Sequence, residues 1–230
     1  MMSRILCASV ARSGAVLNTV ERLVQDSAQL GVPVSEPDAA RLMRLLDELE
    51  RWNRAYNLTA IRKREDMLTH HLLDSLSVHS ELRGTTVADV GTGAGFPGLP
   101  LAIVNPSRRF TLIDSAGKKI RFVQHAAREL GLENVEGLHA RVDDEKRVFD
   151  TVVARAFAPL PELLAGVAHL CGPATRVLAM KGQWPQAEID AIPAGWHHEG
   201  SHELTVPGLD ESRCVVVLSR GRPTSSQSSA

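Results

Sequence analysis

The hydrophobic residues in the first third of the chain recur every three or four positions, which is the spacing of amphipathic helices. Gly31 is a natural end for the first helix, and Ser35-x-x-Asp38 resembles a capping box that opens the second. A third helix is predicted over residues 65–80. The apolar stripes of the three helices are Val16, Val20, Leu23 and Val24, then Leu42, Leu45, Leu46, Leu49 and Trp52, then Leu68, Leu72 and Leu76. We therefore expect a helical N-terminal extension at residues 16–84.

From Thr86 onward, short β-branched segments alternate with helical ones. The strand-like segments are TVADV at 86–90, RFTLID at 109–114, NVEGLHA at 134–140, FDTVVA at 149–154 and TRVLAM at 175–180. The clearest intervening helix spans 117–130, with Ile120, Val123, Ala127 and Leu130 on one stripe. This alternation predicts an α/β domain at 85–220, with a mainly parallel sheet of about seven strands and helices on both faces. The last run, RCVVVLS at 213–219, is expected to be an edge strand in a closing hairpin.

The composition is that of a globular protein. Of the 230 residues, 43% are hydrophobic and 23% are charged, which argues against a disordered or fibrous chain. No apolar stretch reaches the ~18 residues that a transmembrane helix needs. The formal net charge of −1 excludes a globally basic surface that would coat nucleic acid, but it leaves room for a local basic face.

The three cysteines, Cys7, Cys171 and Cys214, are widely spaced and form no C-x-x-C motif. Neither a disulfide framework nor a zinc site is expected, and we place the protein in the reducing cytoplasm. Cys171 is interpreted as a core residue in the helix after the fourth strand. The start of the chain lacks a signal-peptide pattern, so residues 1–15 are expected to be disordered, as is the polar tail at 221–230.

A glycine-rich turn follows the first predicted strand, from Gly91 to Gly98. It is not the dinucleotide fingerprint G-x-G-x-x-G, because Phe96 stands at the third required position. It is not a phosphate-binding P-loop either, because Leu99 follows Gly98 where that motif requires lysine. The remaining pattern, D-x-G-x-G-x-G from Asp89, suits a nucleoside without a pyrophosphate, such as S-adenosylmethionine, whose ammonium can pair with Asp89. The alternative is a tight turn with a structural role only.

Two acids follow later strands of the predicted sheet. Asp114 closes the second strand, 23 residues after Gly91, where a carboxylate accepts the ribose hydroxyls in doubly wound folds. The alternative for Asp114 is a helix N-cap, because a helical segment follows it directly. Asp143, after the third strand, is placed to reach an adenine amino group, and its alternative is a solvated loop acid.

Six motifs give the chain a family resemblance. They are RWNRAYNLTAIR at 51–62, HLLDSL at 71–76, DVGTGAGFPGLPLAI at 89–103, TLIDSAGKKIRF at 111–122, RAFAPL at 155–160 and MKGQ at 180–183. Through these motifs, from about residue 16 to residue 219, the sequence resembles the GidB/RsmG family of bacterial 16S ribosomal RNA guanine-N7 methyltransferases. The resemblance implies a Rossmann-like methyltransferase fold in residues 85–220, with S-adenosylmethionine as the cofactor.

The resemblance also implies residue roles and a substrate. The implied cofactor contacts are Gly91, Phe96, Val142, Asp143 and Arg155, and Asp114 falls where this class of fold holds the ribose. The segment DEKRVF after Asp143 is shorter than in some members, which leaves the conformation of that loop open. The implied acceptor is N7 of one guanine, guanine 527 in the family, in 16S ribosomal RNA or the small ribosomal subunit.

The residues after the fourth strand narrow the type of methyl transfer. Residues 155–159 lack the [DN]-P-P-[YF] motif of amino-group enzymes and the cysteine of cytosine-C5 enzymes, and no ribose-methylating Lys-Asp-Lys-Glu tetrad is apparent. Guanine N7 carries a lone pair and no proton, so no general base is expected, and Arg155 is predicted to orient the reactants. Two alternatives remain: a methyltransferase acting on another RNA or a small molecule, and a non-catalytic nucleotide-sensing or RNA-binding module.

Local basic clusters make an RNA substrate plausible despite the neutral total charge. Lys118, Lys119, Arg121 and Lys181 are the predicted phosphate contacts, and the alternative is that they only solvate a helix surface. A second cluster at 51–64 surrounds Trp52, which is interpreted as a core residue. The pair His70-His71 is expected to pack or cap rather than bind metal, and no metal site is predicted. We expect a monomer that binds neither DNA nor membrane.

Overall fold

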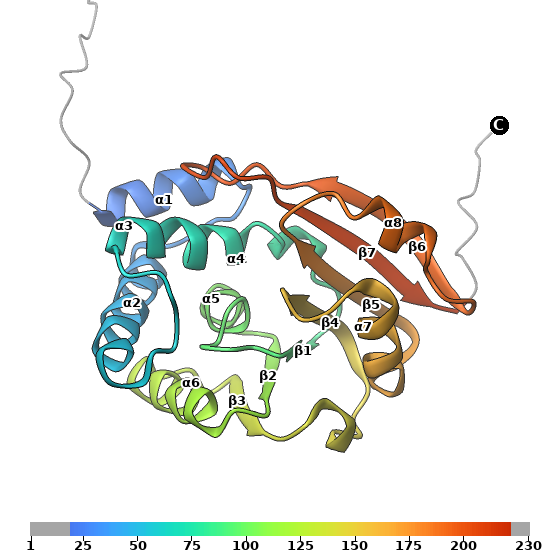
Figure 1. Ribbon diagram of the computed structural model, residues 1–230. Helices are drawn as coiled ribbons and strands as arrows, with labels where there is room; N and C mark the ends of the chain where they lie inside the picture. Colours follow the sequence, from blue (N-terminus) through green and yellow to red (C-terminus); the bar gives the residue numbers. More distant parts are fainter. Residues whose placement is uncertain (1–18, 222–230) are drawn as a thin grey trace, which may run out of the picture.

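The computed structural model describes residues 19–221 and consists of one seven-stranded sheet covered by helices on both faces (Figure 1). The expectations for residues 1–15, for Val16 and for the tail beyond Gly221 lie outside the described residues. Within residues 19–221, no helix is both long enough and apolar enough to span a membrane.

The sheet confirms the predicted mainly parallel arrangement. Its strands are β1 (Thr86–Val90), β2 (Arg109–Asp114), β3 (Val135–His139), β4 (Phe149–Arg155), β5 (Cys171–Lys181), β6 (Trp196–Glu203) and β7 (Cys214–Arg220). They lie in the order β3-β2-β1-β4-β5-β7-β6, and the first five are parallel to one another. Strand β7 is antiparallel to both of its neighbours, β5 and β6. We call the side of the sheet at which β1, β2, β4 and β5 end the carboxyl edge.

The prediction that 213–219 forms an edge strand is wrong, although the hairpin itself is present. Strand β7 lies inside the sheet, and the edge is formed by β6, a polar segment that the hydrophobic pattern does not reveal. The run Val215–Leu218 is buried because its alternate side chains enter the hydrophobic cores on the two faces of the sheet. A continuous apolar run of this kind is typical of a strand covered on both faces.

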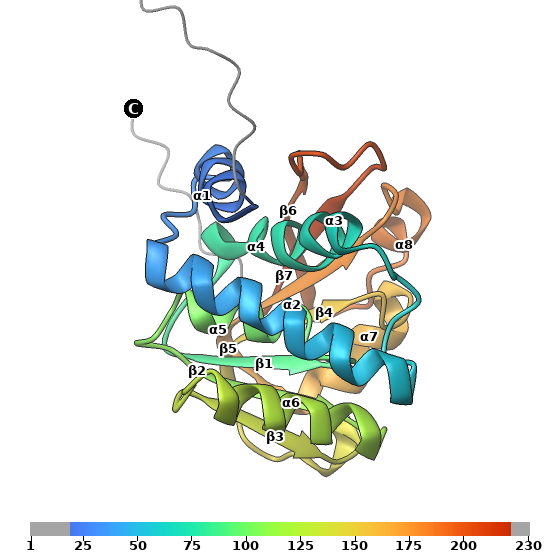
Figure 2. The ribbon, with the colours of Figure 1, turned by 90° about the vertical axis from the view of Figure 1, so that its left-hand side faces the viewer.

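The helices divide unequally between the two faces. On one face lie α1 (Thr19–Gln29), α2 (Glu36–Tyr56), α3 (Arg64–Met67), a π-helical segment (Leu68–Leu73), α4 (Asp74–Leu76), α5 (Gly98–Ile103) and α6 (Gly117–Glu129). On the other face lie α7 (Leu160–Val167) and α8 (Gln186–Asp190) (Figures 1 and 2). Short 3-10 turns occupy His79–Glu81, Val142–Asp144 and Ala168–Leu170. The helix predicted over 65–80 is thus one helical segment interrupted by a π-helical stretch.

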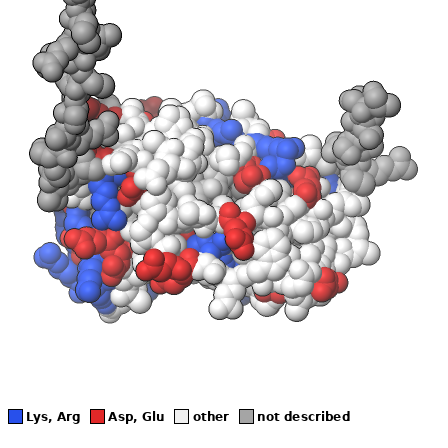
Figure 3. All heavy atoms as spheres, turned by 90° about the horizontal axis from the view of Figure 1, so that it is seen from above, with Lys and Arg blue, Asp and Glu red and all other residues white. Residues whose placement is uncertain are grey.

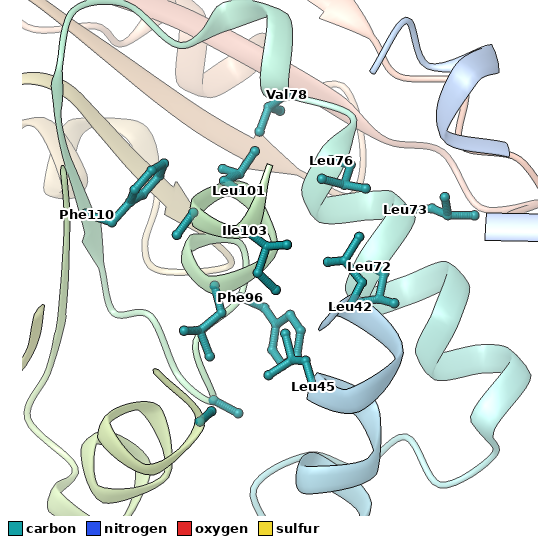
Figure 4. Close-up of a cluster of buried hydrophobic side chains, with 14 of the residues drawn as sticks. Leu42, Leu45, Leu72, Leu73, Leu76, Val78, Phe96, Leu101, Ile103 and Phe110 are labelled. Atoms are coloured by element: carbon teal, nitrogen blue, oxygen red, sulfur yellow. The ribbon is translucent and has the colours of Figure 1, made fainter. Parts of the chain in front are cut away.

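The N-terminal helices share a single core with the sheet. The Ser35 side chain caps α2 by accepting the Asp38 N–H, as predicted. Figure 4 shows Leu42 and Leu45 of α2 and Leu72 of the following segment converging on Phe96 and on side chains of α5. Burial of this apolar surface holds α1 to α4 against the sheet, so this segment is well placed to contribute residues to a site there.

The prediction that Cys171 lies in a helix is wrong, because Cys171 is the first residue of β5. The preceding helix ends earlier, at Val167, and a 3-10 turn leads into the strand. The Cys171 side chain is buried, which confirms its interpretation as a core residue, and this burial raises the pKa of its thiol to about 12.

Charge on the face seen from above Figure 1 is mixed. Acidic and basic side chains are interspersed there, with uncharged surface between them (Figure 3). This face therefore carries no continuous basic coat, in agreement with the net charge of −1.

Candidate active site

A cleft of about 520 Å³ opens at the carboxyl edge, where ligands bind in open α/β sheets. Four of the six predicted cofactor residues line it: Gly91, Asp114, Val142 and Asp143. Lys119, Arg141, Ala156 and Phe157 also contribute to its wall. We call this space the Asp114 cleft.

Asp114 links the glycine loop to the start of α6. Its Oδ2 accepts the Gly93 N–H at 2.9 Å, and its Oδ1 accepts the Ala116 N–H at 2.8 Å. Lys119 Nζ lies 3.5 Å from Oδ2. Ala116, and not Asp114, occupies the N-cap position of α6, so the simple N-cap alternative does not describe this carboxylate. The carboxylate lines the cleft, where it is placed to accept further hydrogen bonds.

The glycine loop needs a residue without a side chain at Gly91. Its φ is +66°, and a Cβ there would lie 2.3 Å from Cδ2 of Phe157. The Phe157 ring therefore packs directly on the loop backbone. Sequence reasoning did not single out Phe157, although it belongs to the RAFAPL motif and follows a buried strand.

Asp89 lies beneath the loop and is not among the residues that line the Asp114 cleft. Its Oδ2 accepts hydrogen bonds from Thr92 Oγ1 at 2.6 Å and from the Gly98 N–H at 2.8 Å. Burial raises the pKa of Asp89 to about 6, against the opposing effect of these two hydrogen bonds. The role that the structure gives Asp89 is to hold the loop; pairing with an ammonium stays a prediction.

Phe96 is buried outside the Asp114 cleft. Its ring stacks on His71, with a centroid separation of 4.7 Å, and the guanidinium carbon of Arg155 lies 5.9 Å from its ring centroid. Burial, together with the charge of Arg155, lowers the pKa of His71 to about 3. Phe96 and Arg155 are therefore close to each other but separate from the four residues that line the cleft.

A second cavity, of about 410 Å³, lies on the Arg155 side of the carboxyl edge. Arg155 Nη1 contacts Asp74 Oδ2 at 2.8 Å and the His70 carbonyl oxygen at 2.9 Å. Arg213 Nε lies 3.2 Å from the other oxygen of Asp74. We call this space the Arg155 cavity. Sequence reasoning missed Asp74, although an acid within the apolar HLLDSL motif was an available signal.

Ala156 separates the two spaces and lines both of them. Its φ of +50° is unusual for a residue other than glycine, and such strain is concentrated at functional sites. Arg155 on one side of Ala156 lines the cavity, while Phe157 on the other side lines the cleft. The side chains on either side of Ala156 therefore line different spaces, the Arg155 cavity and the Asp114 cleft.

The four predicted phosphate contacts fall into two groups. Lys118, Lys119 and Arg121 belong to the first turns of α6, and Lys118 Nζ donates to the Tyr56 carbonyl oxygen at 3.1 Å. Lys181 stands apart, with a side chain only 15% exposed. Its Nζ contacts Glu188 at 2.7 Å and the Ala158 carbonyl at 2.8 Å, so it braces the segment that follows Phe157.

Two of the five basic residues in the second cluster pair with nearby acids. Arg51 pairs with Glu48 at 2.6 Å, and Arg64 pairs with two acids of α2. Trp52 is partly buried and packs against Phe122 and against the main core, so it lies at the border of the core. Among residues 19–221, no group of three or more His, Cys, Asp or Glu side chains is placed to hold a metal ion.

The fold matches that of solved methyltransferases. Magnesium protoporphyrin IX methyltransferase of Synechocystis PCC 6803, solved with bound S-adenosylhomocysteine, aligns with a TM-score of 0.54 at 18% identity, over 76% of this chain and 93% of that one. An S-adenosylmethionine-dependent methyltransferase of Aquifex aeolicus aligns with a TM-score of 0.50 at 22% identity, over 64% and 90%. The fold is therefore that of the S-adenosylmethionine-dependent methyltransferases.

Sequence comparison identifies the family. Residues 38–216 match the GidB family, described as rRNA small subunit methyltransferase G, and the chain belongs to this family. A ribosomal RNA small subunit methyltransferase G of Idiomarina loihiensis is 44% identical over 85% of this chain and 95% of its own length. The protein of the same name from Cronobacter sakazakii is 43% identical over 90% and 100%. The predicted family, fold and cofactor, S-adenosylmethionine, are confirmed.

Proposed function

We propose that this protein transfers a methyl group from S-adenosylmethionine to N7 of a guanine in 16S ribosomal RNA, at the position of the family's guanine 527. Family membership and the names of relatives that align over most of both chains support an acceptor in the small ribosomal subunit. The observation that carries the proposal is the contact of two spaces across Ala156, because a transferase must hold a donor and an acceptor side by side.

The residues of the Asp114 cleft fit the cofactor. The Asp114 carboxylate suits ribose hydroxyls, Val142 and Ile113 offer apolar walls to the adenine, and Asp143 lies beside them. Gly91 presents backbone without a side chain at the same cleft. When bound, S-adenosylmethionine supplies an electrophilic methyl group on a positively charged sulfur.

The Arg155 cavity is suited to an acceptor that needs no deprotonation. Its titratable side chains are His70, His71, Asp74, Arg155, Lys181, Arg213 and Cys214. The low pKa of His71 makes it a weak base at neutral pH, and Asp74 lies between two guanidinium groups. Guanine N7 carries an in-plane lone pair and no proton, so a site of this kind suffices for its methylation.

Arg155 acts in this proposal by orienting the reactants. Asp74 and the His70 carbonyl fix its guanidinium beside the strained Ala156, which adjoins the cleft. The chain's contribution to the rate is then mainly alignment, which supplies several kcal/mol in well-oriented reactions. The same alignment requires that water be excluded from the space between the two reactants.

The test is methyl incorporation from labelled S-adenosylmethionine into purified 16S ribosomal RNA and into small-subunit particles, followed by mapping of the modified nucleotide. The expected result is one N7-methylguanine. Label in another RNA, or in a small molecule only, would support a methyltransferase with a different acceptor. Cofactor binding without transfer to any acceptor would support a non-catalytic nucleotide-sensing or RNA-binding module. The two RNA substrates also decide between naked RNA and the assembled particle. We also propose that the protein is a cytoplasmic monomer that prefers RNA to DNA. Gel filtration tests the monomer, and competition with DNA tests the preference for RNA.

A further inference from the structure

The exposed aromatic side chains are confined to one edge of the molecule. The chain has nine aromatic residues, and all nine lie within residues 19–221. Three of them are exposed: Tyr56 by 43%, Phe157 by 42% and Trp184 by 46%. Within residues 19–221, one other large hydrophobic residue is exposed, Val148, which directly precedes β4 and so lies at the opposite edge.

Each exposed ring stands at, or within three residues after, the end of an element that reaches the carboxyl edge. Phe157 comes two residues after β4, and Trp184 comes three residues after β5. Tyr56 ends α2, and its carbonyl is bound by Lys118 at the start of α6, directly after β2. In Figure 2, the C-terminal end of α2 and the helices α7 and α8 lie on the side toward which the β1 arrow points. The three rings therefore lie at the same edge of the sheet as the two spaces described above, and Phe157 lines one of them.

Each of the three exposed rings contacts a neighbouring residue. The Tyr56 ring packs on Trp52, with a centroid separation of 5.2 Å. Phe157 packs on Gly91, and the indole N–H of Trp184 donates to Gln186 at 3.1 Å. Held rings that remain open to solvent are preorganised to stack with a planar ligand.

The charges near these rings suit a polyanion. Lys119 and Arg141 line the Asp114 cleft together with Phe157, and Lys118 is fixed beside Tyr56. Single-stranded nucleic acid is bound by this combination, in which cations neutralise phosphates while bases stack on aromatic faces. A duplex keeps its base faces covered, so its binding cannot use separate rings of this kind.

We propose that Tyr56, Phe157 and Trp184 form a stacking surface for single-stranded RNA around the methyl-transfer site. Phe157 follows Ala156, where the cofactor cleft adjoins the acceptor's Arg155 cavity, and there it stacks with the acceptor base as that base reaches the methyl donor. Tyr56 and Trp184 hold nucleotides that flank it. The identity of the nucleic acid as RNA rests on the proposed function, whereas the stacking surface itself rests on the placement of the rings. The acceptor guanine must then be unstacked from its neighbours before transfer.

The test compares binding of a short single-stranded oligoribonucleotide with binding of the same sequence as a duplex, with S-adenosylhomocysteine present. Tyr56→Leu and Trp184→Leu should each weaken single-strand binding roughly 5- to 150-fold, which corresponds to ~1–3 kcal/mol for one stacked base. Tyr56→Phe and Trp184→Phe keep a ring and should restore most of the affinity. Val148→Ala, an exposed apolar residue at the opposite edge, is the matched control and should change nothing.

Two further readouts distinguish stacking from a general loss of structure. Tryptophan fluorescence should be quenched by the single strand and not by the duplex, and this quenching should be reduced in Trp184→Phe. In methylation assays, Tyr56→Leu and Trp184→Leu should raise KM, while Phe157→Leu should mainly lower kcat. Unchanged single-strand affinity in all three leucine variants, or equal binding of the duplex, would overturn the stacking surface even if methylation is normal. If single-strand binding depends on the rings but no methyl transfer occurs, the proposed function would be contradicted and the stacking surface supported.

Discussion

Arg155 Nη1 lies 2.8 Å from Asp74 Oδ2, and this ion pair joins the end of β4 to the N-terminal helical segment. Arg213, which directly precedes β7, approaches the other oxygen of the same carboxylate at 3.2 Å. Asp74 is almost fully buried, so the two guanidinium groups are held by a carboxylate that has little contact with water. The N-terminal helices therefore position an arginine of the candidate site as well as covering the sheet.

Arg155→Lys should lower the single-turnover rate of methyl transfer at least about tenfold, or ~1.4 kcal/mol of barrier. Lysine keeps the charge but loses the planar group that contacts both Asp74 and the His70 carbonyl. Thermal unfolding and cofactor affinity serve as controls for folding and for the Asp114 cleft. A rate within twofold of the parent protein would show that charge alone suffices at this position.

Asp114→Ala should weaken S-adenosylmethionine binding by roughly 1–3 kcal/mol, the scale of losing a hydrogen bond to a charged group. The side chain also accepts the N–H groups of Gly93 and Ala116, so part of this loss comes from loosening of the loop. Asp114→Asn retains an acceptor and should bind with intermediate affinity. Calorimetry decides: equal affinities for a folded alanine variant and the parent would assign Asp114 a local structural role only.

The positions of Asp114 and Asp74 show what the sequence could and could not predict. The alternation of strands and helices, the glycine loop and Asp114 depend on short-range patterns, namely β-branched runs and a fixed spacing, and the sequence predicted them. The pairing of Asp74 with Arg155 joins residues 81 positions apart, and no local spacing encodes it. Phe96 matched a family pattern, yet its ring is covered by His71 because the core closes over it.

Strand β6 was missed for a different reason. An edge strand has one neighbour and needs little apolar surface, so its sequence WHHEGSHE does not show the alternation of a half-buried strand. What defines β6 is its antiparallel pairing with β7, in which His198 lies opposite Leu218. This pairing forms only in the folded sheet. Tertiary pairing, and not propensity, determines this element.

Lys118, Lys119 and Arg121 should each contribute to the salt dependence of RNA binding. Removing one true phosphate contact lowers the slope of log K against log salt by about 0.7 for a single strand. Lys181→Met should leave that slope unchanged, because its ammonium already pairs with Glu188. Titrations of an oligoribonucleotide at several salt concentrations test both statements, and a reduced slope for Lys181→Met would return Lys181 to the phosphate contacts.

His71 should make the protein less stable as the pH falls. Its pKa is lowered from 6.5 to about 3, mainly by burial, so the folded state keeps it neutral while the unfolded chain takes up a proton. The free energy of unfolding therefore falls from pH ~6.5 downward, by at most ~1.4 kcal/mol per pH unit, and is unaffected by His71 above that pH. Denaturant unfolding of His71→Gln should give a flatter pH profile than the parent; parallel profiles would contradict the buried neutral imidazole. Asp89 titrates in both proteins, so its contribution cancels.

Methyl transfer should proceed without a general base. In the proposed transfer to N7, positive charge would pass from the sulfur to the guanine ring, so the total charge of the site would be unchanged and no proton would leave N7. Single-turnover rates at saturating substrates should therefore be flat between about pH 6 and 9, where a working base would titrate. The groups that come nearest to a base are His70, which is bound to the Asp66 carbonyl, and Asp74, which is bound to Arg155. A rate that rises steeply with pH, and loses that rise in His70→Gln or Asp74→Asn, would overturn the base-free mechanism.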